Sequence, residues 1–156
     1  MMKKIFMLAV LMISAAGFGQ SFMVSEMEML AGGNYQNFKK AVENKDYSYL
    51  ERTDLGRGGA SELFQYNKQS VVKNQIGYER SASEKNPVIR WETDSRDDFY
   101  EFENQLKTAG YEKTGKNNGR NSSSVVYTKG KNSVTLSSSL NQNSEKPKYS
   151  ISAVIR

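Results

Sequence analysis

Residues 61–68 (SELFQYNK) recur later in the chain as residues 122–129 (SSSVVYTK). Both segments end in a Tyr-x-Lys sequence, and Phe64 of the first corresponds to Val125 of the second. Apolar and polar side chains alternate along each segment, which is typical of a β-strand with one buried face. The two segments therefore predict two copies of the same strand in one chain.

The repetition extends to both sides of this strand. Residues 51–53 (ERT) match residues 112–114 (EKT) at the same offset in the sequence. Further along, Pro87 corresponds to Pro147 at an offset shorter by a single residue. A period long enough to contain several elements indicates a repeated supersecondary unit rather than a repeated single strand.

Each copy is expected to begin with a helix. Residues 96–109 should be helical, because Ser95 can cap the N-terminus and apolar side chains recur at helical spacing. Residues 34–44 show the same spacing. Strands are expected at residues 47–53, 61–67, 70–79 and 88–93, and at residues 111–114, 122–128, 133–140 and 149–155. The sequence thus predicts an α+β protein of two tandem αββββ modules, residues 34–94 and 95–156.

Alternation along the strands predicts that one sheet face is buried beneath the helices and the other faces water. Two antiparallel four-stranded sheets can join edge to edge, which hides two edges, and we expect one continuous eight-stranded sheet. The water-facing side is mostly polar and is the predicted partner-binding surface. Its candidate residues are Lys73, Gln75, Arg90, Glu92, Thr135, Ser137 and Ser152.

This order of elements resembles the β-lactamase-inhibitor-protein fold and the PepSY-like secreted proteins, which are built from tandem helix-plus-sheet modules. The resemblance covers most of the chain after residue 19 and rests on element order and repeat period. It implies that the chain grips another protein on its sheet. The repeats are short and the chain has no cysteine for the disulfides of the inhibitor family, so no inhibitory residue is carried over.

Residues 1–19 have the parts of a secretory signal peptide. A basic start precedes an apolar run at residues 5–13, and small residues precede Gln20, where cleavage is expected, with a cut after Ala16 as the alternative. The segment resembles signal peptides of the Bacteroidota. Its apolar run is shorter than the roughly 20 residues that span a bilayer. We expect an exported protein, periplasmic or extracellular after cleavage, without a transmembrane segment and not a lipoprotein.

The chain contains no histidine and no cysteine. These absences exclude thiolate catalysis, disulfides and metal sites that need His or Cys ligands. A carboxylate-based hydrolase needs two acids that converge across a cleft, and the predicted layout offers none. We therefore predict no catalytic residue, no enzyme activity and no cofactor. The net charge of +5 comes without an aromatic-basic recognition signature, so no nucleic-acid partner is expected. We expect a monomer.

Residues 20–33 form a methionine-rich N-terminal segment. The thioethers of Met23, Met27 and Met29 could ligate Cu(I), a soft ion, which makes them candidate metal ligands. Alternatively, Met27 with Phe22 and Leu30 could pack on the first module. The leading prediction is an exported, non-enzymatic module that binds a protein or an envelope component. The alternative is a periplasmic carrier or sensor of a small ligand held between helices and sheet, with Cu(I) as a less favoured ligand.

Overall fold

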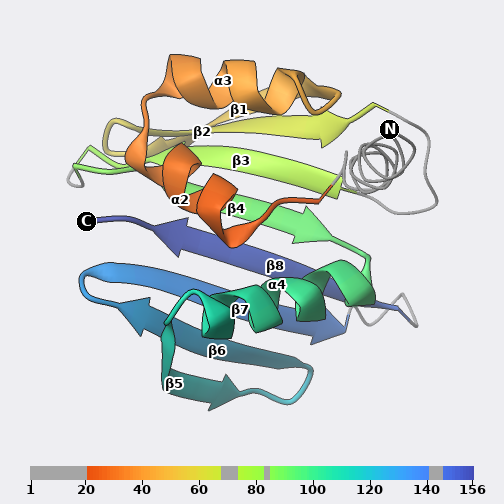
Figure 1. Ribbon diagram of the computed structural model, residues 1–156. Coiled ribbons are helices and arrows are strands. Elements are labelled where there is room, and N and C mark those ends of the chain that lie inside the picture. The colour runs from red at the N-terminus through yellow and green to blue at the C-terminus, as the bar shows by residue number, and fades with distance from the viewer. Residues whose placement is uncertain (1–20, 68–73, 83–84, 141–145) are drawn as a thin grey trace, which may run out of the picture.

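A computed structural model describes residues 21–67, 74–82, 85–140 and 146–156 (Figure 1). These residues form three helices and one eight-stranded sheet. The predicted signal peptide, residues 1–19, and the candidate Lys73 lie outside the described residues. Among the helices of the described ranges, none combines the length and the apolar character needed to cross a membrane.

All neighbouring strands of the sheet are antiparallel, in the order β1-β2-β3-β4-β8-β7-β6-β5. The strands are β1 (Tyr47–Gly56), β2 (Gly59–Tyr66), β3 (Asn74–Arg80), β4 (Val88–Thr93), β5 (Glu112–Asn118), β6 (Ser122–Lys129), β7 (Asn132–Leu140) and β8 (Pro147–Val154). The α+β class and the continuous eight-stranded sheet are therefore confirmed. The sheet has two halves, β1–β4 and β5–β8, which we call the first and the second half. The inner strands β4 and β8 join them, and β1 and β5 form the edges.

The helices are α2 (Val24–Gly32), α3 (Tyr35–Glu43) and α4 (Arg96–Thr108). The side chain of Ser95 caps α4 by accepting a hydrogen bond from the backbone N–H of Asp98 at 3.2 Å. Asn34 caps α3 in the same way, accepting from the N–H of Asn37 at 2.9 Å. Both caps satisfy backbone donors that have no partner within the helix.

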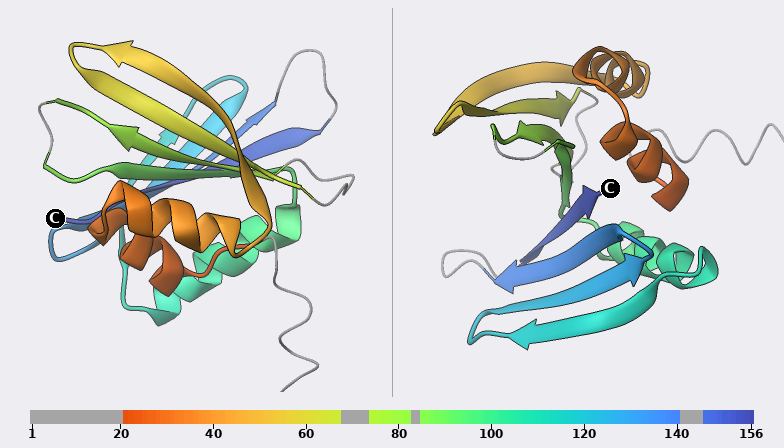
Figure 2. Two further views of the ribbon diagram at one scale, coloured as in Figure 1. Left: turned by 90° about the horizontal axis from the view of Figure 1, so that it is seen from above. Right: turned by 90° about the vertical axis from the view of Figure 1, so that its left-hand side faces the viewer.

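All three helices lie on one side of the twisted sheet (Figure 2). Helix α3 contacts β1 and β3, whereas α2 and α4 both contact the inner strands β4 and β8. Side chains that point toward the helices are buried along β4 and β8, and the alternate side chains are partly or fully exposed. We call the second set, with its counterparts on the other strands, the helix-free face.

The hydrophobic core is centred where the two halves of the sheet meet. Trp91 on β4 lies directly opposite Ile151 on β8, and both side chains are fully buried. The Trp91 ring also packs edge-on against Phe22, before α2, and Phe102 of α4, with centroid distances of 5.6 and 6.1 Å. One continuous core therefore underlies both halves.

Helix α2 was not predicted as a helix, because its N-cap residue is Met23 rather than Ser, Thr, Asp or Asn. The carboxylate of Glu26 instead accepts the Met23 N–H at 2.8 Å and so satisfies a donor at the helix start. Glu28 of α2 accepts a hydrogen bond from the Tyr111 hydroxyl at 2.7 Å. Burial and the Glu28 carboxylate raise the pKa of Tyr111 to about 12. Lys45, after α3, pairs with Glu26 at 2.9 Å, so α2 is tied to both halves of the chain.

The first hairpin is longer than the sequence predicted. Strand β1 continues to Gly56, because the turn is made at residues 56–58, all of which have positive φ. The matched triplets at residues 51–53 and 112–114 also differ in register. Glu51 lies opposite Leu63 on β2, whereas Glu112 lies opposite Thr128 at the far end of β6. Sequence identity at these edge strands therefore does not correspond to equivalent places in the sheet.

Candidate binding surfaces

The predicted binding residues lie on two adjacent rows of cross-strand neighbours in the middle of the helix-free face. The first row runs through Gln75, Glu92, Ser150 and Ser137, on β3, β4, β8 and β7. The second row runs through Gly77, Arg90, Ser152 and Thr135 on the same strands. The six predicted residues that the structure describes thus form one contiguous patch.

The charged part of this patch is centred on Arg90. Its guanidinium makes two contacts with the Glu79 carboxylate, Nε to Oε1 at 3.2 Å and Nη2 to Oε2 at 3.3 Å. Paired nitrogens of this kind match a carboxylate geometrically and hold both side chains in place. Glu79 was missed as a candidate, although it follows Gly77 by two residues on β3 and therefore lies on the same face of the sheet.

Hydroxyl side chains cover the helix-free face of β6, β7 and β8. They are Ser122, Ser124 and Thr128 on β6, Ser133, Thr135, Ser137 and Ser139 on β7, and Ser150 and Ser152 on β8. Among these strands, Val126 and Val154 are the apolar members of the face and Lys148 is its charged member. We call this set the hydroxyl patch. It offers donors and acceptors in regular rows and almost no charge.

One small hollow lies beside the central patch. The hollow beside Gln75, Glu92 and Lys148 has a volume of about 30 Å³. Such a space holds about one water molecule. This hollow is thus too small to enclose a metabolite.

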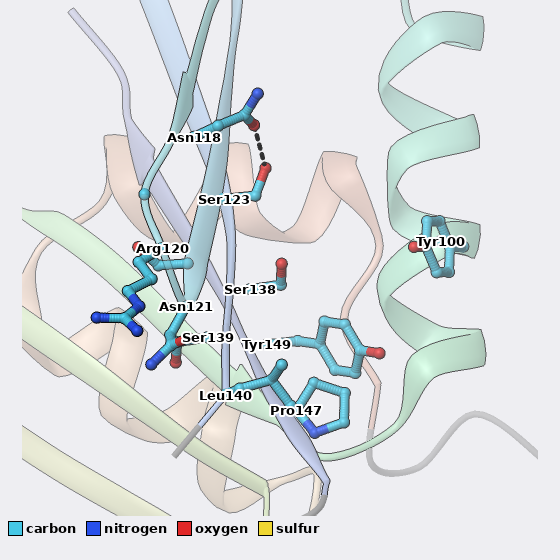
Figure 3. A pocket seen from close by; sticks show the side chains of 12 residues that line it. Tyr100, Asn118, Arg120, Asn121, Ser123, Ser138, Ser139, Leu140, Pro147 and Tyr149 are labelled. Atoms are coloured by element: carbon cyan, nitrogen blue, oxygen red, sulfur yellow. Dashed lines mark hydrogen bonds between the residues drawn. The ribbon is translucent and has the colours of Figure 1, made fainter. Parts of the chain in front are cut away.

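A larger open groove lies on the opposite side of the sheet, beside α4 (Figure 3). Its volume is about 430 Å³. Tyr100 of α4 stands on one side of the groove, and Ser123, Ser138 and Tyr149 of β6, β7 and β8 point toward it from the sheet. The hairpin between β5 and β6 closes one end. No residue of this groove was among the predicted binding residues, because sequence alternation does not show where a helix leaves the sheet uncovered.

The three candidate copper ligands differ in their surroundings. Met27 is buried in the core with 1% of its side chain exposed, whereas Met23 and Met29 are exposed. Met27 and Met29 are separated by a single residue on α2, which places them on different sides of the helix. The structure thus does not bring these two thioethers to one surface, and Met27 fills the core as in the packing alternative. Copper binding stays a prediction.

The carboxylates near α4 are engaged in structural contacts. Glu103 accepts a hydrogen bond from the Tyr127 hydroxyl and pairs with Lys107 at 3.3 Å. Burial raises the pKa of the Asp98 carboxyl, which lies in the first turn beside Asp97. Across the described ranges, no three His, Cys, Asp or Glu side chains gather closely enough to hold a metal ion.

Comparison of the chain with protein-family models, with curated proteins and with solved structures gives no match. The functional argument therefore depends on the surfaces themselves: a polar helix-free face and an open groove beside α4.

Proposed function

We propose that the protein is an exported, non-enzymatic module that binds a glycan component of the cell envelope through the helix-free face. The observation that carries this proposal is the hydroxyl patch, which continues without a break into the patch around Arg90 and Glu92. A flat array of neutral donors and acceptors matches a polymer that presents many hydroxyl groups. Such a polymer gains affinity from many weak contacts rather than from one enclosed group.

A glycan explains this face better than a protein partner does. Protein interfaces are enriched in aromatic side chains and depleted of Ser, and their binding energy is concentrated in Trp, Tyr and Arg. The cross-strand rows of the described helix-free face contain no aromatic side chain. Its central arginine, Arg90, already pairs with Glu79 within the chain.

Two tandem αββββ modules, residues 34–94 and 95–156, account for the breadth of this face. Outward from the join, the order is β4-β3-β2-β1 in one half and β8-β7-β6-β5 in the other, so each half runs from its last strand to its first. Trp91 and Ile151, which correspond at the same offset as Pro87 and Pro147, lie directly opposite each other at the join. This supports two copies related by a twofold axis between these residues. Joining them doubles the helix-free surface without adding an exposed edge.

Export is part of the proposal and depends on the basic, apolar and small-residue regions of residues 1–19. Expressed as the full chain in a bacterial host, the protein should be recovered outside the cytoplasm with Gln20 as its first residue. The mass of the purified protein checks this. A mass that still includes residues 1–19 in the exported fraction, or retention in the cytoplasm, contradicts export by this signal.

Replacing Thr135, Ser137 and Ser152 together with alanine should weaken glycan binding about tenfold or more. Each lost hydroxyl removes a hydrogen bond worth about 0.5–1.5 kcal/mol, and three losses multiply in the dissociation constant. Binding is measured by co-sedimentation with purified peptidoglycan sacculi and, separately, by retention on immobilised outer-membrane lipopolysaccharide.

The matched control replaces three exposed polar residues on the helices, Ser25, Gln36 and Asn104, with alanine and should bind as the unaltered protein does. The proposal is wrong if neither glycan binds, or if the hydroxyl variant binds both as well as the control. Capture of an envelope protein that is lost in the hydroxyl variant identifies a protein partner for this face instead and contradicts the glycan.

A further inference from the structure

The two halves of the sheet place different side chains at the same topological position beneath their helices. On the strand next to the central pair, the first half has Tyr78 on β3, opposite Ile89 on β4. The second half has Ser138 on β7, opposite Tyr149 on β8. A large ring in one half is thus matched by a hydroxymethyl group in the other.

In the first half, the Tyr78 ring fills the space between sheet and helix. It packs against Tyr35 and Phe38 of α3, with ring centroids 5.4 and 5.2 Å apart. In the second half, the ring belongs to Tyr149, one strand nearer the centre, and packs on Phe99 of α4 at 4.6 Å. The space above Ser138 therefore stays open as the groove of about 430 Å³ (Figure 3). This volume lies within the range of about 300–1,000 Å³ typical of small-molecule sites.

The two outer strands next to this position, β1 and β2 in the first half and β5 and β6 in the second, differ in the charge of their side chains. In the first half, Arg52 and Glu62 are cross-strand partners and form an ion pair at 3.3 Å. In the second half, the partners next to Ser138 are Asn118 and Ser123, and the Ser123 hydroxyl donates to the Asn118 side-chain oxygen at 3.2 Å. The groove thus has neutral polar groups where the first half has two charges.

The described residues that line the groove carry a single charged side chain. Arg120 contributes to its hairpin end, and Figure 3 shows its side chain pointing away from Tyr100. Among the described lining residues, Arg120 at the hairpin end is the charged one, so an ionic group held between Tyr100 and Ser138 would leave water with no counter-charge from these residues beside it, which is costly. The chemistry therefore favours an uncharged ligand with several hydrogen-bonding groups.

The apolar surfaces of the groove come from Tyr100, Leu140 and Pro147. The Tyr100 side chain is 46% exposed, and its ring is held by Arg96, 5.4 Å from the centroid, and edge-on by Phe99 at 5.5 Å. A fixed, partly exposed aromatic ring can pack on an apolar ligand face at little cost in side-chain entropy. The hydroxyls of Ser123 and Ser138 and the Asn118 amide lie across from it.

We infer that this groove binds one neutral sugar ring. A pyranose has C–H groups on its faces, which suit Tyr100 and Pro147, and hydroxyls around its edge, which suit the serines and the asparagine amide. Tyr100, Ser138 and Tyr149 lie on the opposite side of the sheet from the helix-free face, and the groove reaches the hydroxyl patch at Ser122 and Ser139. It shares no residue with the set that tests the proposed function, so it does not depend on that function. It adds a second contact, in an open groove, for a single sugar unit.

The test is an NMR titration of the mature protein, residues 20–156, with cellobiose and with N,N′-diacetylchitobiose. At least one disaccharide should shift the backbone amide signals of Asn118, Ser123, Ser138 and Tyr149 in a saturable manner. Ser138→Tyr, which restores the ring that Tyr78 supplies in the first half, should weaken binding at least tenfold. Tyr100→Ala, at an exposed side chain where folding is not at risk, should also weaken binding several-fold.

Gln36→Tyr is the matched control, because it adds the same ring at an exposed position on α3, outside both the groove and the helix-free face. It should leave disaccharide binding unchanged. The inference is overturned if neither disaccharide binds, or if Ser138→Tyr and Tyr100→Ala both bind like the unaltered protein. It is also overturned if the disaccharide shifts the backbone amide signals of Arg90, Glu92 and Ser152 instead, since the sugar then occupies the helix-free face.

Discussion

Replacement of Trp91 by alanine should lower the free energy of unfolding by about 3–5 kcal/mol. Trp91 is fully buried on the inner strand β4, at the join between the two halves of the sheet. Its ring packs on Phe22 next to α2 and on Phe102 of α4, and Ile151 lies opposite it on β8. Truncation therefore leaves a cavity bordered by the sheet and two helices, which cannot close without moving all three.

Urea unfolding at equilibrium measures this effect, followed by far-ultraviolet circular dichroism because Trp91 is the single tryptophan of the chain. Leu55→Ala serves as the control, since Leu55 is a large apolar residue that is 55% exposed on β1. Its effect should stay within about 0.5 kcal/mol. A loss below about 1 kcal/mol for Trp91→Ala would show that the two halves do not share one cooperative core.

The sheet could be predicted from sequence because its signals are local and periodic. Alternation assigns Phe64, Tyr127 and Ile151 to the buried face, and each is buried in the structure. Ser95 and Asn34 are residue types that cap helices, and both act as caps. These features depend on neighbouring residues alone, so one sequence is sufficient to find them.

The features that were missed depend on contacts between distant parts of the chain. Helix α2 follows Met23, which is not an N-cap residue of the usual type, and is held by Tyr111 and Gln105 from the second half. The groove exists because Ser138 stands where the first half has Tyr78, and this equivalence becomes visible only with the strand register. The register at the edge strands could not be predicted either, because bulges in β1 and β5 shift it at different places.

The polar residues of the helix-free face could be predicted from the sequence only in part. Alternation grouped Gln75, Arg90 and Glu92 on one face, and the pairing of β4 with β8 places Ser152 and Ser150 directly beside Arg90 and Glu92. The ion pair between Arg90 and Glu79 could not be predicted from alternation, because both side chains must also lean toward each other along the face. Sequence thus identifies the members of a sheet face more readily than the contacts among them.

Substitution of Met27 by lysine should destabilise the protein by about 3 kcal/mol or more, whereas Met29→Lys should change its stability by less than about 0.5 kcal/mol. The two residues lie on the same helix, and both changes are identical in chemistry. Met27 is 1% exposed in the core beneath α2, but Met29 is 64% exposed. A lysine at residue 27 must either bury an ammonium group or pull α2 away from β4 and β8.

Urea unfolding of both variants, with the unaltered protein measured alongside, gives the two differences directly. A large loss confined to Met27→Lys shows that α2 folds as part of the common core rather than as a loosely attached segment. The contacts of α2 with Lys45 from the first half and Tyr111 from the second explain why this loss should affect the whole chain. Equal and small effects for the two variants would contradict this, and would mean that α2 can leave the sheet without unfolding the rest.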